Sequence, residues 1–192
     1  MDLPAFLCDW GKIWSPYSEK YYIEVLSELS PEDVVLDIGA GDLRLTRRIA
    51  EKCKFVYALE INPDIIKLGI ESCGQPIPDN LIILNLDARY FSFPEDVTSA
   101  VLLMRHCTDV KLYIKKLMEV GASRLITNAR WRLGVEVIDL LTERIDYRDL
   151  RIGSYGCICG SVGFKPGDTR DLTPGIEIIV NEVINCPACL VA

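Results

Sequence analysis

Two glycines and three acidic residues in the first half of the chain have a spacing that suits ligand binding. Asp37, Gly39 and Gly41 follow a short apolar run, and Glu60 and Asp87 come later. The glycines allow the backbone to turn sharply and to approach a ligand closely. Glu60, about 20 residues after Asp37, can accept both hydroxyls of a ribose, and Asp87 can reach an adenine amino group. The set predicts a site for a nucleotide-like ligand.

The acidic side chain of Asp42 helps to decide which of two classes of nucleotide-like ligand the site would bind. A dinucleotide fingerprint reads G-x-G-x-x-G and places a pyrophosphate on the N-terminus of the next helix. Here the sixth position is Arg44, and Asp42 would lie beside the pyrophosphate and repel it. S-adenosylmethionine carries a sulfonium and an ammonium cation and no phosphate, so an acidic turn suits it. The pattern therefore favours this methyl donor over NAD or FAD.

Strand-like and helix-like segments alternate around these residues. Short apolar runs predict strands at 34–38, 55–59, 81–86, 100–104, 124–127 and 176–184. Apolar residues at helical spacing, with proline and glycine at the ends, predict helices at 20–29, 42–50, 63–70, 109–120 and 135–141. Unbroken apolar strands that alternate with helices indicate an α/β fold with a parallel sheet covered on both faces.

The Asp37–Gly41 run, Glu60 and the Asp87-Ala88 pair resemble motifs I, II and III of the class I S-adenosylmethionine-dependent methyltransferases. The resemblance covers roughly residues 18–145 and includes the order of strands and helices. It implies a Rossmann-like sheet of seven strands with the last strand antiparallel and helices on both faces. The donor-binding residues that it implies are Asp37, Gly39 and Gly41 for the methionine part, Glu60 for the ribose, and Asp87 with Ala88 for the adenine.

The chain departs from this family at two places. Asp42-Leu43 stands where a threonine-glycine pair commonly follows the second glycine, which affects the expected geometry of the turn. Family members that methylate amide or exocyclic amino nitrogens often carry Asn-Pro-Pro-Tyr after the fourth strand. This chain has Met104-Arg105-His106 there, so the sequence does not support that chemistry.

The segment after the fourth strand is expected to border the methyl acceptor. Because an imidazole ordinarily changes its charge near neutral pH, His106, the only histidine, is a candidate catalytic base or acceptor ligand. The alternative is that it caps the following helix or binds a carbonyl. Arg105 would bind an anionic group of the acceptor, or pair with Asp109.

Two further segments are expected near the acceptor. Asn128, Arg130 and Trp131 follow the fifth strand and form a second candidate wall, with a structural tryptophan as an equal alternative. The aromatic-rich lead-in at residues 3–22 either packs on the sheet or covers the pocket as a lid.

Four of the eight cysteines form two close pairs, Cys157 with Cys159 and Cys186 with Cys189. Four thiolates make a closed tetrahedral ligand set for a structural zinc ion. An iron–sulfur cluster could use the same ligands, and free or redox-active thiols are the third interpretation. The other four have no pairing pattern and are expected to act as small apolar residues; they are Cys8, Cys53, Cys73 and Cys107.

The 192 residues predict one domain with an appendage. Residues 1–150 would form the donor-binding methyltransferase core with its helical lead-in. Residues 151–192 would form a four-cysteine metal-binding element that completes the sheet.

The formal charge of −7 argues against a general nucleic-acid or membrane-surface binder, because phosphates repel an acidic protein. The acceptor is then a small metabolite, a protein or an RNA, with nucleic acid not favoured. We expect no targeting segment and no membrane span, and therefore a cytoplasmic location. The alternative function is a non-catalytic protein of the same fold whose zinc element docks a partner.

Overall fold

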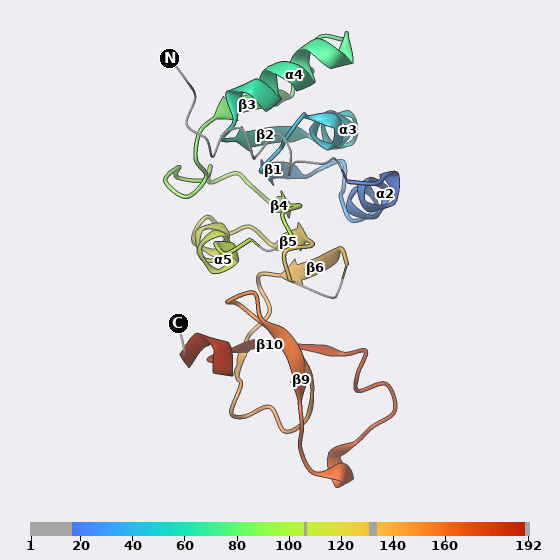
Figure 1. Cartoon of the computed structure of the whole chain (residues 1–192), viewed down its shortest axis with the longest axis vertical. Helices are drawn as coiled ribbons and strands as arrows, with labels where there is room; N and C mark the ends of the chain where they lie inside the picture. Colours follow the sequence, from blue (N-terminus) through green and yellow to red (C-terminus); the bar gives the residue numbers. More distant parts are fainter. Residues whose placement is uncertain (1–16, 106, 131–133, 191–192) are drawn as a thin grey trace, which may run out of the picture.

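The structure, a computed structural model, describes residues 17–105, 107–130 and 134–190. Within these residues, one sheet has six strands in the order β3-β2-β1-β4-β5-β6 (Figure 1). The strands are β1 (Val34–Ile38), β2 (Phe55–Glu60), β3 (Leu81–Asn85), β4 (Ser99–Leu102), β5 (Arg124–Thr127) and β6 (Glu136–Asp139). The first five run parallel, and β6 pairs antiparallel with β5. The predicted α/β Rossmann-like fold is therefore confirmed.

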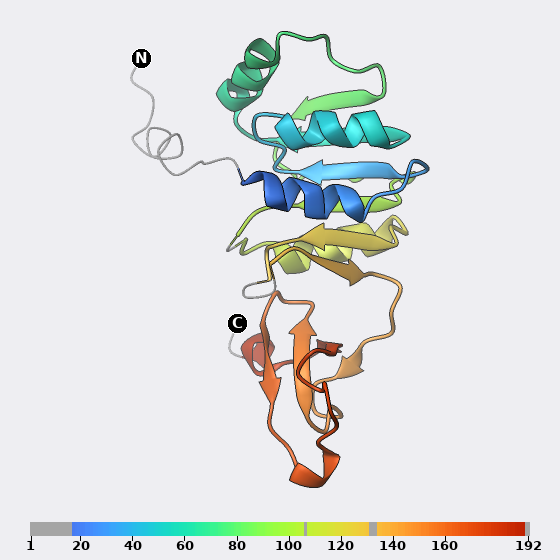
Figure 2. The same cartoon turned by 90° about the vertical axis from the view of Figure 1, so that its right-hand side faces the viewer.

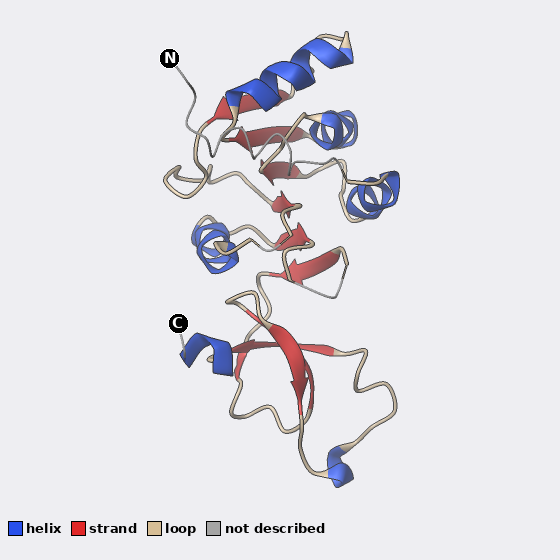
Figure 3. Ribbon diagram, viewed as in Figure 1, coloured by secondary structure: helices blue, strands red, loops and turns tan. Residues whose placement is uncertain are grey.

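Four α-helices accompany this sheet in the described part of the chain, namely α2 (Glu19–Ser27), α3 (Arg44–Lys52), α4 (Pro63–Cys73) and α5 (Val110–Glu119). Helices α2 and α3 cover one face and α5 covers the other, while α4 lies at the β3 edge (Figures 1 and 3). In α4, the Asn62 side chain accepts a hydrogen bond from the Asp64 N–H and Gly74 ends the helix with a φ of 62°, so both ends are capped. No helix among the described residues is long and apolar enough to cross a membrane.

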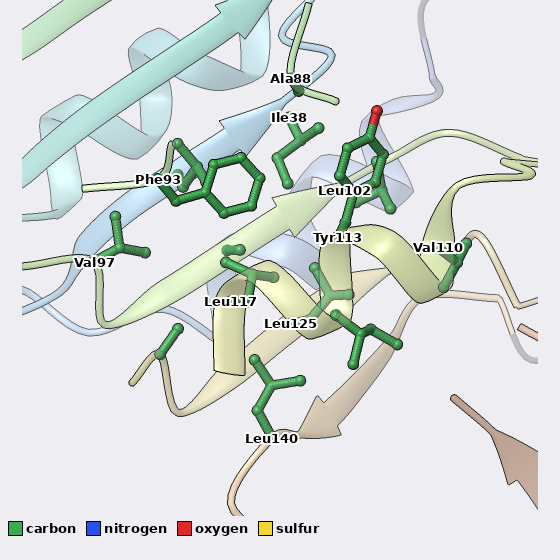
Figure 4. Packing of buried hydrophobic residues seen from close by; sticks show 14 of the residues in the cluster. Ile38, Ala88, Phe93, Val97, Leu102, Val110, Tyr113, Leu117, Leu125 and Leu140 are labelled. Atoms are coloured by element: carbon green, nitrogen blue, oxygen red, sulfur yellow. The ribbon is translucent and has the colours of Figure 1, made fainter. Parts of the chain in front are cut away.

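Each face of the sheet has its own hydrophobic core. The core beneath α5 contains Phe93, Leu102, Tyr113, Leu117 and Leu125 (Figure 4). The core beneath α2 and α3 contains residues that alternate with these along the strands, such as Val101 and Ile126. All five residues of β1 are buried, because both of its faces are covered.

The C-terminal strands form a second sheet beyond β6 (Figure 2). Its order is β7-β10-β8-β9, with β7 (Ile145–Asp146), β8 (Gly153–Cys157), β9 (Val162–Lys165) and β10 (Val180–Ile184). Strand β10 runs parallel to β7 and β8, and β8 and β9 form an antiparallel hairpin. Two short 3₁₀ helices, Thr169–Asp171 and Pro187–Leu190, complete this part.

Two predictions about this region are wrong. Residues 135–141 were expected to be helical but include β6, since Val135, Val137 and Ile138 are β-branched and side chains alternate between exposed Val137 and buried Ile138. The antiparallel strand of the first sheet is this β6. The C-terminal strands pair with one another, so they do not supply a seventh strand or complete the first sheet.

A buried arginine joins the two sheets. Arg130 lies between β5 and β6, and its side chain is only 1% exposed. Its guanidinium donates to both carboxylate oxygens of Glu136 on β6 (2.9 and 2.7 Å) and of Glu182 on β10 (3.0 and 2.6 Å). A Cβ at Gly156 on β8 would collide with this guanidinium, so a larger residue there would have to displace it from its ion pairs. These ion pairs explain why the C-terminal sheet stands directly beside β6.

Candidate active site

The turn after β1 is a tight, left-handed loop. Gly39 and Gly41 have φ values of 76° and 59°, which favour glycine, and Leu43 also has a positive φ of 63°. The Gly39 and Ala40 N–H groups both donate to the Leu59 carbonyl of β2, at 2.8 and 3.0 Å. Helix α3 consequently begins at Arg44, two residues later than the sequence predicts. A Cβ at Gly39 would lie 3.0 Å from the Met104 Cε, so the turn passes directly against the segment after β4.

Glu60 ties this turn to the end of β2. One of its carboxylate oxygens accepts the Gly41 N–H at 3.0 Å and the other accepts the Asn62 N–H at 2.8 Å. The residue is 9% exposed. A carboxylate has about four lone-pair sites, so two protein hydrogen bonds leave one site on each oxygen for a diol. The residue pattern indicated Glu60, whereas the contribution of the Asn62 backbone was not foreseen.

Asp37 is the most deeply buried acid of the site, with 4% exposure. The Thr46 hydroxyl of α3 donates to its Oδ2 at 2.6 Å. Burial raises the pKa of Asp37 to about 6; the Thr46 hydrogen bond opposes this shift and the nearby Glu60 carboxylate adds to it. The sequence analysis did not single out Thr46, although it lies nine positions after Asp37 on the first turn of the following helix.

Asp87 lies just after β3, next to Glu60 in the sheet, because the Leu86 N–H donates to the Glu60 carbonyl at 3.1 Å. Its carboxylate accepts three hydrogen bonds from the Arg89 guanidinium, and this contact lowers the pKa of Asp87. The loop after Asp87 is anchored to α5 by the Lys116 ammonium, which donates to the Ala88 and Phe91 carbonyls at 2.5 and 2.6 Å. Asp37, Glu60 and Asp87 are thus brought to one edge of the sheet by β1, β2 and β3.

On the other side of this edge, Arg105 is held by two tyrosines near the start of α2. Its guanidinium lies over the rings of Tyr17 and Tyr21, 5.6 and 5.1 Å from their centroids, and donates to the Tyr21 hydroxyl. Its backbone N–H donates to the Tyr17 hydroxyl at 3.2 Å. Among the described residues no ion pair joins Arg105 to Asp109. His106 and Trp131 lie outside the described residues, as does the lead-in before residue 17.

The two described residues of the predicted second wall differ in their surroundings. Arg130 forms ion pairs with Glu136 and Glu182, so it is part of the contact between the two sheets. Asn128, directly after β5, is 5% exposed, and neither its Nδ2 nor its Oδ1 has a hydrogen-bond partner in the described part of the chain. A buried carboxamide without partners is costly, so this residue differs from an ordinary core position.

The four cysteines predicted as metal ligands converge in the second sheet. Cys157 ends β8, Cys159 follows it, and Cys186 and Cys189 come after the adjacent parallel strand β10. Their sulfurs are separated by 3.6 Å (Cys157 to Cys189), 3.5 Å (Cys159 to Cys186) and 3.9 Å (Cys186 to Cys189). All four lie within 4.8 Å of one another. Sulfurs bound ~2.3 Å from one tetrahedral Zn²⁺ would be about 3.8 Å apart, so the arrangement fits this ion.

Comparison with known proteins identifies relatives of the first sheet. The sequence model of the ribosomal RNA adenine dimethylase family matches residues 19–123, more than half of the chain. A probable ribosomal RNA small subunit methyltransferase A of Methanosarcina acetivorans is 37% identical over 73 residues, 38% of this chain and 26% of that protein. The chain therefore spans about a quarter of the length of this relative. A probable cobalt-precorrin-6B C(15)-methyltransferase of Methanococcus vannielii is 28% identical over 62% of this chain and 65% of that protein.

Solved structures agree on the fold. The precorrin-6y C5,15-methyltransferase of Geobacter metallireducens superposes with a TM-score of 0.53 at 17% identity, over 61% of this chain and 65% of that chain. A dimethyladenosine transferase of Plasmodium falciparum superposes with a TM-score of 0.50 at 18% identity, over 59% and 41%. The extent of the family match identifies the chain as a member of the ribosomal RNA adenine dimethylase family, within the class I S-adenosylmethionine-dependent methyltransferases.

Proposed function

We propose that this protein is an S-adenosylmethionine-dependent methyltransferase whose donor site lies at the carboxyl ends of β1, β2 and β3. The observation that carries the proposal is the Glu60 carboxylate, which is bound to the Gly41 and Asn62 N–H groups and keeps lone pairs free beside the glycine turn. When bound, S-adenosylmethionine supplies an electrophilic methyl group on a cationic sulfur.

Each residue at this edge then has a role that follows from its chemistry. Glu60 binds the two ribose hydroxyls. Asp37 places negative charge near the cationic methionine part, and the glycine turn allows the backbone to come close to it. Asp87, oriented by Arg89, accepts a hydrogen bond from the adenine amino group, and Ala88 lines the base.

Methyl transfer also requires an acceptor aligned with the donor. Arg105 and His106, after β4, are the residues we assign to the acceptor side, with His106 as the base or acceptor ligand. The tyrosines over Arg105 hold its guanidinium in one position, which suits an anionic group of the acceptor.

We propose a nucleobase as the acceptor. The family name, and the relatives named as ribosomal RNA methyltransferases, support this class. Against it stand the net charge and the lack of Asn-Pro-Pro-Tyr after β4. A nucleobase acceptor therefore requires another hydrogen-bonding group at this edge. The precorrin methyltransferase relative raises a tetrapyrrole as the competing acceptor.

We also propose that the four cysteines bind one structural zinc ion. The distances between the sulfurs support this. The hydrophobic cluster of the second sheet has only four buried residues among those described, so this sheet needs a cross-link such as a metal ion for stability. The metal would cross-link the ends of β8 and β10.

The test is calorimetry with S-adenosylhomocysteine, followed by transfer of a labelled methyl group to unmodified ribosomal RNA. We expect binding of one equivalent. Replacement of Glu60 by Gln should weaken it, because glutamine cannot accept both hydroxyls, whereas Glu95→Gln, a matched change away from this edge, should not. If wild type does not bind S-adenosylhomocysteine, the proposed function is wrong. Binding without transfer to ribosomal RNA would contradict this acceptor, and would leave the tetrapyrrole and the non-catalytic alternative.

A further inference from the structure

We propose that Asn128 is the residue that recognises the acceptor base through its side-chain carboxamide. This inference rests on the proposed function, since it concerns the acceptor side of the same site. No backbone group or side chain of the described chain forms a hydrogen bond with either polar atom of this carboxamide.

The position of Asn128 follows from the strand register. Leu102 at the end of β4 pairs with Thr127 at the end of β5, so the next residues, Leu103 and Asn128, lie level at the carboxyl edge. The segment after β4 is the one that borders the acceptor.

Alternation along β5 places Asn128 on the α2 face of the sheet. Leu125 packs in the core beneath α5 and Ile126 in the core beneath α2, so Asn128, two residues after Ile126, belongs to the α2 face. Leu103 and Tyr17 pack against that same core. Tyr17 also binds Arg105. Asn128 and Arg105 thus come from neighbouring strand ends to the same side of the sheet.

The lack of partners argues for a ligand. Asn80 shows the ordinary state of an asparagine in this protein, because its Nδ2 donates to the Ala50 and Cys53 carbonyls at 2.8 and 3.0 Å. In Asn128 both the donor and the acceptor are buried and unpaired in the described chain. A leucine of similar size would avoid this cost. A ligand that pairs with both atoms removes the cost only in the complex.

The chemistry of the carboxamide defines what it can pair with. It presents one donor and one acceptor side by side, so its complement is a planar edge with an adjacent acceptor and donor. Asparagine makes such a pair with adenine. Arg105 on the same face would bind a phosphate of the same nucleotide. A free nucleotide and an RNA both offer this edge.

The experiment uses wild type and Asn128→Leu, each saturated with S-adenosylhomocysteine so that the donor site is filled. Adenosine 5′-monophosphate and an oligoadenylate RNA are titrated separately, with uridine 5′-monophosphate for comparison. We expect Asn128→Leu to weaken the adenine ligand by about 5- to 150-fold, with unchanged S-adenosylhomocysteine binding. Binding of the mononucleotide identifies a free nucleotide as sufficient, and binding of the oligoadenylate alone identifies RNA.

Thermal unfolding separates recognition from a structural role. Asn128→Leu should leave the midpoint unchanged or raise it, because it removes an unpaired buried group. Asn80→Leu, the matched control, should lower the midpoint by about 2–12 °C and leave nucleotide binding intact. The inference is overturned if wild type loaded with S-adenosylhomocysteine binds neither adenine ligand, if Asn128→Leu binds them equally well, or if Asn128→Leu is as unstable as the control. Failure to bind S-adenosylhomocysteine would instead overturn the proposed function.

Discussion

Substitution of Glu182 by Gln should make the C-terminal sheet unfold at a lower temperature than the first sheet. The Arg130 guanidinium is almost completely buried and depends on two carboxylates, Glu136 and Glu182, which are 12% and 13% exposed. Arg144, with a side chain only 6% exposed, places its Nε 4.0 Å from the Glu182 carboxylate. Two arginines and two glutamates thus balance one another. Glu182→Gln would leave two buried positive charges beside one negative charge.

The size of the effect follows from burial. Removing one partner of a buried ion pair costs about 3–5 kcal/mol, because the remaining charge is out of water and unpaired. For a protein of this length each kcal/mol shifts the thermal midpoint by about 2–4 °C, so the midpoint should fall by about 6–20 °C. The matched control is Asp168→Asn, because both carboxylate oxygens of Asp168 likewise accept hydrogen bonds from one guanidinium, that of Arg170, which is 88% exposed. An exposed pair contributes ~0–1 kcal/mol, so the control should move little.

Differential scanning calorimetry is the suitable assay, because Glu182 is on β10 and Arg130 belongs to the first sheet. In Glu182→Gln the C-terminal sheet should unfold earlier, as a separate transition before the main one. If Glu182→Gln and Asp168→Asn have the same midpoint, or if the variant keeps one transition at the wild-type temperature, the buried ion pairs do not hold the sheets together.

Three further outcomes are expected. The raised pKa of Asp37 means that the folded protein favours the protonated form of this side chain. The free energy of unfolding should therefore fall by ~3 kcal/mol as the pH rises from about 4 to about 6. Urea unfolding should detect this fall in wild type and not in Asp37→Asn. Gly39→Ala should weaken S-adenosylhomocysteine binding, measured by calorimetry, by at least ~10-fold. Gly74 has a similar φ, but a Cβ there would meet no atom within 4 Å, so Gly74→Ala should only lower the free energy of unfolding, by ~1 kcal/mol. Equal binding by both variants would contradict the tight turn. Elemental analysis should find about one zinc per chain in wild type and in Cys107→Ala, and much less in Cys189→Ser; an unchanged content in Cys189→Ser would exclude the four-sulfur site.

The first sheet was predictable because its strands are continuous apolar runs. Residues 34–38 form a short apolar run bounded by turn residues, which is typical of a strand covered on both faces, and the structure buries every one of these residues. The acids at the strand ends were predictable for the same reason, since parallel strands place their carboxyl ends along one edge. The strand order alone is enough to place Glu60 near Asp37, and the structure has these two carboxylates close enough to interact.

Of the second sheet, such runs predicted only β10, which lies within the strand expected at 176–184. Glycine-rich β8 and the short β7 have little hydrophobic pattern, and their position depends on Arg130 reaching Glu182, 52 residues away. The contact also requires Gly156, which is uninformative in the sequence alone. The sequence analysis named Asn128, but its lack of hydrogen-bond partners within the described residues leaves no pattern in a sequence.

The four-cysteine element and the acceptor segment meet at the first turn of α5. A Cβ at Gly160, which directly follows Cys159, would lie 3.6 Å from the Val110 Cβ. Ile158 and Cys107 both pack against the core beneath α5. An ion bound by the thiolates would fix the turn that carries Ile158, and this turn supports the residues after β4. Loss of the ion should therefore loosen the proposed acceptor side first, because β1 and β2, which carry two of the proposed donor residues, lie on the far side of β4 (Figure 1).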